Sequence, residues 1–184
     1  MSVRVALIVG SLRQGAYSRA IGLELKALAA PGLELELVEI GDLPLYNPDL
    51  ETDGPPPAWT RFREEVATTQ AVLFVTPEYN RSIPGALKNA LDVGSRPYGH
   101  SIWANKPAAI VSVSPGALAA FGANHHLRQP LVFLGMPTMQ QPEAYIGNVA
   151  DLLDDDGKLK NDDTRKFLKD FMNAFATWIE KNAA

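Results

Sequence analysis

Two serines and two arginines gather in residues 10–19, a segment that holds no acidic side chain. The segment follows the apolar run 3–9 and precedes a helical pattern, so it is expected to lead from a strand into a helix. The first amides of a helix have no acceptor within the helix, and the helix dipole makes that end positive. Ser11 and Ser18 would add hydroxyl donors and Arg13 a permanent charge, so the segment predicts a site for a phosphate dianion.

The same segment departs from the common nucleotide motifs. Ala16 and Tyr17 stand where a Walker loop needs Lys and Ser or Thr, and Leu12 stands where a dinucleotide fingerprint needs glycine. Gly10 and Thr76 end two of the predicted strands, where aspartyl-phosphate chemistry would need an acid. The segment therefore favours a monophosphate ligand over a pyrophosphate.

A purely structural alternative also exists for these loops. Ser18 could cap the helix while Arg13 and Arg19 lie in solvent. Two further loops, residues 76–85 and 114–122, combine prolines with small residues and could line a slot for a planar ring. Taken singly, either loop could be an ordinary turn.

Composition narrows the classes of function. The chain has no cysteine, which excludes disulfides, iron–sulfur clusters and cysteine nucleophiles. Its 17 Lys+Arg against 21 Asp+Glu give no reason to expect nucleic acid or an anionic membrane surface as a partner. No apolar run approaches the ~18 residues of a membrane span, so a cytoplasmic protein is expected.

Metal binding is not expected either. His125 and His126 are neighbours, and neighbouring side chains on a helix point about 100° apart. In residues 154–157, taking Gly157 as the turn glycine of a calcium loop puts Leu152 in the first ligand position. Both motifs are interpreted as structural.

Strands and helices are predicted to alternate along the chain. Apolar or alternating runs predict strands at residues 3–9, 33–40, 71–75, 107–113 and 137–140, and helices at 20–28, 58–70, 85–93, 121–134 and from 162 onward. Residues 41–57 hold five prolines and are expected to form a long surface loop.

Such alternation requires crossover connections, so a parallel sheet with helices on both faces is expected within a single domain, residues 1–184. The polar second strand and the apolar first, third and fourth suit a five-stranded sheet in the order 2-1-3-4-5. In that order ligands bind beyond the carboxyl ends of the strands. The loops after strands one, three and four should therefore converge on the site.

At these loops the sequence resembles the NAD(P)H-dependent FMN reductase family, which includes chromate and quinone reductases. The resemblance covers nearly the whole chain. Its marks are Gly10-Ser11-Leu12-Arg13 with Ser18, then Thr76-Pro77-Glu78-Tyr79-Asn80, then residues 82–92, and Ser114-Pro115-Gly116. It implies a three-layer flavodoxin-like α/β fold, noncovalently bound FMN, and NADPH or NADH as co-substrate.

The resemblance also assigns roles to residues. Ser11, Arg13 and Ser18 would hold the FMN phosphate, and Ser114, Pro115 and Gly116 would close one side of the ring. The ribityl chain and the ring would be bordered by Pro77, Glu78, Tyr79, Asn80 and Ser82. After Gly116 the sequence departs from many members, because residues 117–120 replace a more glycine-rich stretch. Residues 124–129, with Pro142 and Glu143, would take part in assembly into a homodimer or homotetramer.

The function expected from the resemblance is oxidoreduction, with electrons passed by a ping-pong mechanism to quinones, chromate or similar small acceptors. No catalytic side chain is required, because the hydride chemistry belongs to the flavin. The alternatives are a flavodoxin-type electron carrier and an FMN-binding protein without NAD(P)H turnover. Flavodoxin-type carriers are typically strongly acidic and have a phosphate loop without arginine. This chain has a net charge of only -4 and carries Arg13 in that loop.

Overall fold

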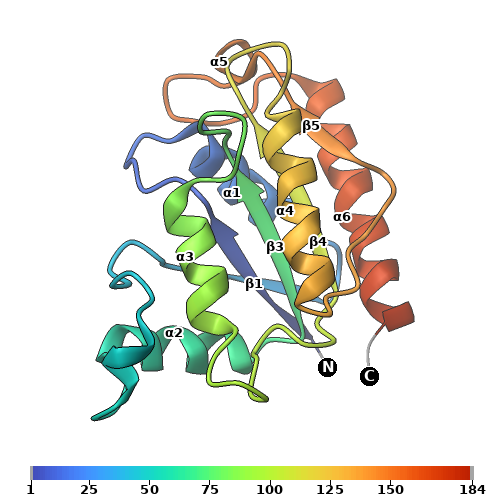
Figure 1. The fold of residues 1–184 in the computed structure, drawn as a ribbon. Coiled ribbons are helices and arrows are strands. Elements are labelled where there is room, and N and C mark those ends of the chain that lie inside the picture. The colour runs from blue at the N-terminus through green and yellow to red at the C-terminus, as the bar shows by residue number, and fades with distance from the viewer. Residues whose placement is uncertain (1, 183–184) are drawn as a thin grey trace.

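A computed structural model describes residues 2–182 and shows one five-stranded parallel sheet (Figure 1). The strands are β1 (Val3–Val9), β2 (Leu33–Val38), β3 (Ala71–Thr76), β4 (Ala108–Val113) and β5 (Ala144–Ile146). Their order across the sheet is β2-β1-β3-β4-β5, so the predicted flavodoxin-like fold and strand order are confirmed.

Burial along the strands follows the sequence pattern. Every residue of β3 and β4 is buried, as expected for apolar runs covered on both faces. β2 alternates apolar and acidic residues, pairs only with β1, and keeps much of one face accessible. The position of each strand in the sheet therefore follows from how many of its side chains can be exposed to water.

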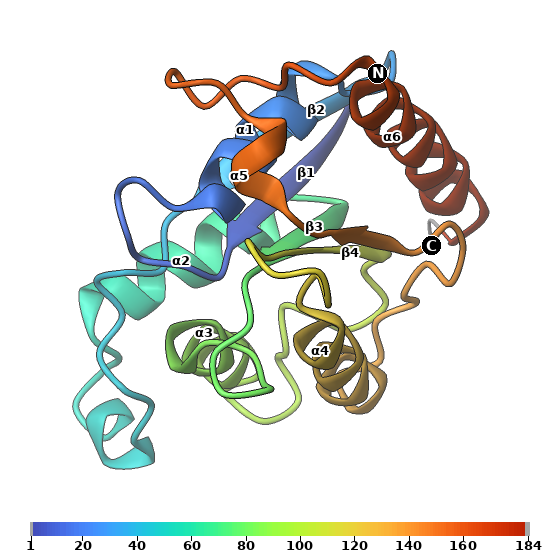
Figure 2. The same ribbon diagram turned by 90° about the horizontal axis from the view of Figure 1, so that it is seen from above.

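Helices cover both faces of the sheet, as Figure 2 shows from above. One face carries α1 (Tyr17–Ala27), the short α5 (Val149–Leu152) and α6 (Asp162–Asn182), and the other carries α2 (Pro57–Ala67), α3 (Gly85–Gly94) and α4 (Phe121–Phe133). Each face has its own buried cluster. Phe171 and Phe175 fill the first, while Trp59 and Trp103 fill the second.

The predicted fifth strand at residues 137–140 is wrong. That segment makes a single bridge to the start of β4, between Thr138 and Ala108, and the strand proper is Ala144–Ile146. Pro137 and Pro142 have no amide hydrogen, so a continuous ladder cannot form along this stretch. The sequence patterns also left out α5 and a 3₁₀ turn, η1 (Pro48–Glu51), inside the proline-rich loop.

The reversal of strand order between β1 and β3 needs a close approach at the carboxyl ends of these strands. A Cβ on Gly10 would lie 3.0 Å from the Thr76 hydroxyl oxygen and 3.2 Å from a Leu87 methyl carbon. Glycine lets the end of β1 approach both β3 and α3, and it places the loop that follows beside the loop after β3. Across residues 2–182, no helix combines the length and the apolar character that a membrane span requires.

Candidate functional site

The loops after β1, β3 and β4 meet at the carboxyl edge of the sheet, as predicted. They enclose a hollow of about 170 Å³. Eight predicted residues line it: Ser11, Arg13, Ser18, Pro77, Glu78, Tyr79, Ser114 and Pro115. A second hollow of about 360 Å³ shares Arg13 and Tyr79 with the first and extends to the start of α3. Sequence-distant residues are thus brought to one place by the strand order.

Ser18 is the most informative residue of this site. Its side chain is buried in the first turn of α1, and among residues 2–182 its hydroxyl is the one buried side-chain oxygen or nitrogen without a hydrogen-bond partner. The N-cap position of α1 is Ala16, and no side chain caps the helix. The structural alternative, in which Ser18 caps α1, is therefore wrong, and a buried polar group without a partner calls for another explanation.

The two arginines of the loop after β1 differ in their surroundings. The Arg19 guanidinium is paired with the Glu39 carboxylate at 2.6 Å, and this hydrogen bond raises the pKa of Arg19 above its usual value. Arg13 lines both hollows, and its guanidinium has no hydrogen bond or ion pair within residues 2–182. Arg13 is thus available to a ligand, whereas Arg19 is engaged at the surface.

Ser11 joins the loop after β1 to the loop after β3. Its hydroxyl lies 3.4 Å from the Tyr79 hydroxyl and 3.3 Å from the Arg13 amide, which donates to it. Tyr79 and Ser82 exchange backbone hydrogen bonds of 2.9 and 3.1 Å around the two-residue turn Asn80-Arg81. This turn fixes where the Tyr79 ring stands at the boundary between the two hollows.

Three predicted residues lie outside the smaller hollow. Asn80 is in the exposed turn, Ser82 faces α4, and Gly116 is exposed beyond Pro115. Conversely, Ala16, Tyr17 and Val113 line the hollow and were not predicted. Ala16 and Tyr17 could have been found from their place between Arg13 and Ser18, and Val113 from its place at the end of a predicted strand.

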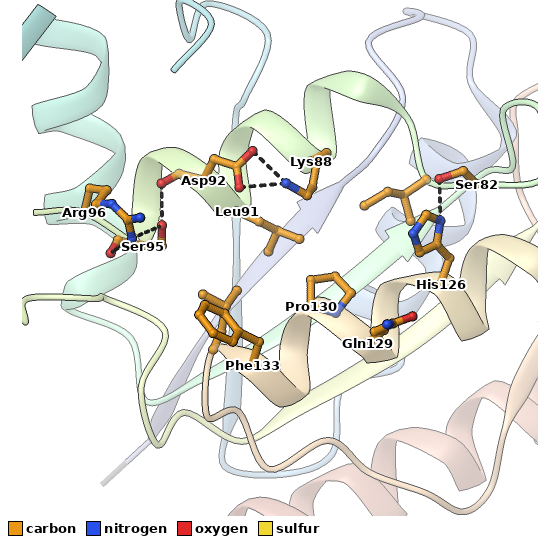
Figure 3. Close-up of a pocket in the computed structure, with 12 residues that line it drawn as sticks. Ser82, Lys88, Leu91, Asp92, Ser95, Arg96, His126, Gln129, Pro130 and Phe133 are labelled. Atoms are coloured by element: carbon orange, nitrogen blue, oxygen red, sulfur yellow. Dashed lines mark hydrogen bonds and ion pairs between the residues drawn. The ribbon is translucent and has the colours of Figure 1, made fainter. Parts of the chain in front are cut away.

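A larger cavity of about 550 Å³ lies between α3 and α4 (Figure 3). Its floor is apolar, with Leu91 and Pro130, the exposed Phe133 stands at its edge, and its rim carries the Lys88–Asp92 ion pair at 2.8 Å. At the end nearest the site, the Ser82 hydroxyl lies 2.6 Å from His126 Nδ1 (Figure 3). The cavity therefore adjoins the site through the loop after β3 but is not part of it.

Within residues 2–182 no group of three or more His, Cys, Asp and Glu side chains could hold a metal ion. His126 contacts Ser82, and His125 Nε2 lies 3.0 Å from the Tyr145 hydroxyl. Burial, with the neighbouring Glu143 carboxylate, raises the pKa of Tyr145 to about 12, so this phenol stays protonated at neutral pH. These side chains serve contacts between α4 and its neighbours.

The donor set fits a phosphate ester. It consists of a buried hydroxyl without a partner, an uncommitted guanidinium and the start of a helix whose first turn holds no acid. Fold and site together define a doubly wound protein with a candidate site for an anionic ligand beyond the carboxyl ends of its strands, at the point where the strand order reverses.

Comparison with known proteins identifies the class further. The family model for NADPH-dependent FMN reductases matches residues 3–151, and the chain belongs to this family of FMN-using oxidoreductases. It is similar to a quinone reductase of Pseudomonas putida, with 62% identity over 180 residues, 98% of this chain and 96% of that protein. A 2-hydroxy-1,4-benzoquinone reductase of a Burkholderia species is 42% identical over 97% of each chain.

A solved structure supports the same grouping. The flavoenzyme FerB of Paracoccus denitrificans, an NAD(P)H:acceptor oxidoreductase, superposes with a TM-score of 0.93 at 43% identity, covering 99% of this chain and all of that one. The resemblance stated from the sequence motifs is thus confirmed at the level of family, fold and cofactor class.

Proposed function

We propose that this protein is an NAD(P)H-dependent FMN oxidoreductase that passes electrons to quinones, chromate or similar small acceptors. The observation that carries the proposal is the partnerless buried hydroxyl of Ser18, beside the uncommitted Arg13 and the start of α1. A quinone acceptor is favoured by the names of the two relatives, a quinone reductase and a 2-hydroxy-1,4-benzoquinone reductase.

The proposed contacts follow the three loops. Ser11, Arg13 and Ser18 hold the phosphate, because they supply two hydroxyls and a fixed positive charge at the helix end. The ribityl chain and the ring lie against the loop after β3, which comprises Pro77, Glu78, Tyr79, Asn80 and Ser82. Ser114, Pro115 and Gly116 form the opposite wall.

Bound FMN supplies the redox chemistry, accepting a hydride from NADPH or NADH and passing electrons to the acceptor. No catalytic side chain is proposed. The residues of this chain orient the ring, keep one face of it open for stacking, and exclude water from the other. Because the nicotinamide and the acceptor need the same open face, they enter in turn, which is a ping-pong mechanism.

The decisive experiment uses the purified protein under anaerobic conditions. We expect the absorption spectrum of bound FMN, and bleaching of that spectrum on rapid mixing with NADPH or NADH. A protein that binds FMN but is bleached by neither nucleotide is an electron carrier or a binding protein without turnover, and the proposed activity is then refuted.

Arg13→Ala tests the phosphate contact, with Arg19→Ala as a matched control. A hydrogen bond to a charged group contributes about 1.5–3 kcal/mol, so Arg13→Ala should weaken FMN binding by about tenfold or more. Arg19→Ala should leave binding nearly unchanged, because its guanidinium is held by Glu39. Equal retention of flavin by the two variants after dialysis would contradict the assigned contact.

We further propose that the protein assembles as a homodimer or homotetramer in the cytoplasm, where NAD(P)H is available. The cavity between α3 and α4 offers a second copy an apolar floor and a charged rim (Figure 3). Val132 and Phe133, at the end of α4, are 77% and 86% exposed. Large apolar side chains exposed next to an apolar cavity favour an interface between protein chains. Residues 124–129, Pro142 and Glu143 remain a predicted part of the assembly.

A further inference from the structure

The Glu78 side chain stands among the residues of the smaller hollow, but its carboxylate is already engaged. One oxygen, Oε2, accepts a hydrogen bond of 3.0 Å from the Ala123 amide in the first turn of α4. The other, Oε1, lies 3.3 Å from the Arg81 guanidinium, and the side chain is only 14% exposed. The N-cap residue of α4, Ala120, offers no side-chain hydrogen bond, so Glu78 caps this helix from another element.

Gly122 shows how closely the two elements approach. A Cβ at this position would lie 2.9 Å from Glu78 Oε2 and 3.1 Å from the Arg81 carbonyl oxygen. A Cβ contact below 3.0 Å is essentially never found, so a side chain at 122 would turn the flexible Glu78 carboxylate away from the start of α4, and the Arg81 carbonyl would have to shift by a few tenths of an ångström. The absence of a side chain at Gly122 therefore leaves the space that the Glu78 carboxylate occupies at the start of α4.

Further bonds make the loops and α4 a single unit. One turn along α4 from Ala123, His126 Nδ1 lies 2.6 Å from the Ser82 hydroxyl. On the other side, the buried Ser112 hydroxyl donates to the Ala119 carbonyl at 2.8 Å, which ties down the end of the loop after β4. The two loops that face each other across the hollow are thus both anchored to the same helix end.

We propose that Glu78 is a positioning residue, which fixes the loop after β3 against α4 and so sets the distance between the two walls of the FMN slot. It does not contact the FMN phosphate. The positive end of α4 and Arg81 balance the charge of its carboxylate, which would otherwise repel a phosphate dianion. The assignment rests on the proposed function, because it needs FMN to occupy this slot.

Three variants test the assignment. Glu78→Ala removes the hydrogen bond, Glu78→Gln keeps an acceptor oxygen at the same place without the charge, and Gly122→Ala drives the carboxylate off the helix while leaving it in the chain. Glu65→Ala is the control, since Glu65 is an exposed acid of α2 paired with Arg61. The measurements are the FMN dissociation constant, the visible circular dichroism at saturating FMN, and hydrogen exchange of the Ala123 amide.

We expect Glu78→Ala and Gly122→Ala to raise the FMN dissociation constant by about tenfold, because FMN must then order the loop that the Glu78–Ala123 hydrogen bond holds in place in the wild type. Both should change the dichroism of bound flavin even at saturation, and both should speed exchange at Ala123. Glu78→Gln should stay within about threefold of the wild type, with wild-type dichroism. A residue important only for global stability would leave the saturated flavin spectrum unchanged.

Different outcomes of these measurements would refute the positioning role of Glu78 and the proposed function of the protein. If the wild type binds FMN and Glu78→Ala binds it with the same constant and spectrum, the positioning role is refuted and the proposed function stands. The same holds if Glu78→Gln is as defective as Glu78→Ala, because the charge and not the hydrogen bond would then matter. If the wild type itself does not bind FMN, the proposed function fails, and this assignment fails with it.

Discussion

At the scale of single residues, replacing Ser18 should have opposite effects on two properties: it should not destabilise the apoprotein, but it should weaken FMN binding. An unpaired buried hydroxyl costs about 1–3 kcal/mol, so Ser18→Ala should leave the free energy of unfolding of the apoprotein unchanged or raise it by about 1 kcal/mol. The same substitution removes a phosphate donor and should weaken FMN binding by about tenfold. Urea unfolding of the apoprotein and quenching of FMN fluorescence measure the two effects.

Thr69 supplies the control for Ser18. Its hydroxyl is equally buried but donates to the Val66 carbonyl at 2.8 Å. Thr69→Val should therefore lower the free energy of unfolding by about 1 kcal/mol and leave FMN binding unchanged. If Ser18→Ala destabilised the apoprotein as Thr69→Val does, Ser18 would be a structural residue and not a ligand donor.

Arg81 occupies a strained backbone position. Asn80 and Arg81 have φ angles of 52° and 67°, the left-handed pair of a two-residue turn whose second position favours glycine. We expect Arg81→Gly to raise the free energy of unfolding by about 1 kcal/mol, since the Arg81 guanidinium is largely exposed and the Glu78 carboxylate keeps its hydrogen bond from the Ala123 amide. The melting temperature should rise by roughly 2–4 °C.

Asn80→Gly is the matched variant for this turn. Asparagine tolerates the left-handed region, so the change should stay within about 0.5 kcal/mol. An Arg81→Gly protein that melts at or below the wild-type temperature would show that the arginine side chain, and not the backbone, determines stability here.

The sequence indicated which residues form the candidate site better than it indicated the contacts that these residues make. Ser11, Arg13 and Ser18 could be found because strand ends and helix starts leave amides without partners, which is a local property. The engagement of Glu78 by α4 could not be found, since residues 78 and 123 meet only when the sheet is assembled. The contact of Ser82 with His126 could not be found for the same reason.

At the scale of elements, a buried carboxylate holds the segment 153–161 on the back of α1. Glu24 is almost fully buried, with Lys158 at 3.2 Å, Arg165 at 3.4 Å and the Leu159 amide at 3.4 Å. Glu24→Ala should lower the free energy of unfolding by about 2 kcal/mol, less than a fully buried pair would cost, because both cations can turn to water. Trypsin should then cut the native protein faster after Lys158 and Lys160.

Glu65→Ala is the comparison, because Glu65 belongs to an exposed pair on α2 that is worth about 0.3–0.5 kcal/mol. Tryptic cleavage of the Glu24→Ala protein at the wild-type rate would mean that the packing of Leu153 and Leu159, and not the ionic contact, holds the segment.

Element boundaries show where local patterns are sufficient. Strands β1, β3 and β4 were predicted within one residue at each end, because continuous apolar runs stop at glycine, proline or polar residues. The second strand and the first helix end earlier than expected, at Val38 and Ala27. The fifth strand was misplaced because Ala144–Ile146 is too short to show a period, and its pairing with β4 depends on the completed sheet.

At the scale of the whole molecule, strand order could be predicted because hydropathy fixes which strands are central. A strand buried on both faces must have neighbours and covering helices, and the alternating β2 can only lie at an edge. The hydropathy of the strands does not predict quaternary structure in the same way. The cavity between α3 and α4 and the exposure of Phe133 emerge only from the packed helices.

Phe133→Asp tests the assembly of whole chains. If a second copy covers the groove between α3 and α4, a charge at its apolar edge is buried without a partner, and the variant should fall to a smaller assembly than the wild type. Leu45→Asp is the control, since Leu45 is 78% exposed in the proline-rich loop, outside this cavity. Light scattering coupled to size exclusion gives both masses. A monomeric wild type would refute the oligomer outright, and a Phe133→Asp protein of wild-type mass would place the interface elsewhere, leaving residues 124–129 and Glu143 as the surface to test next.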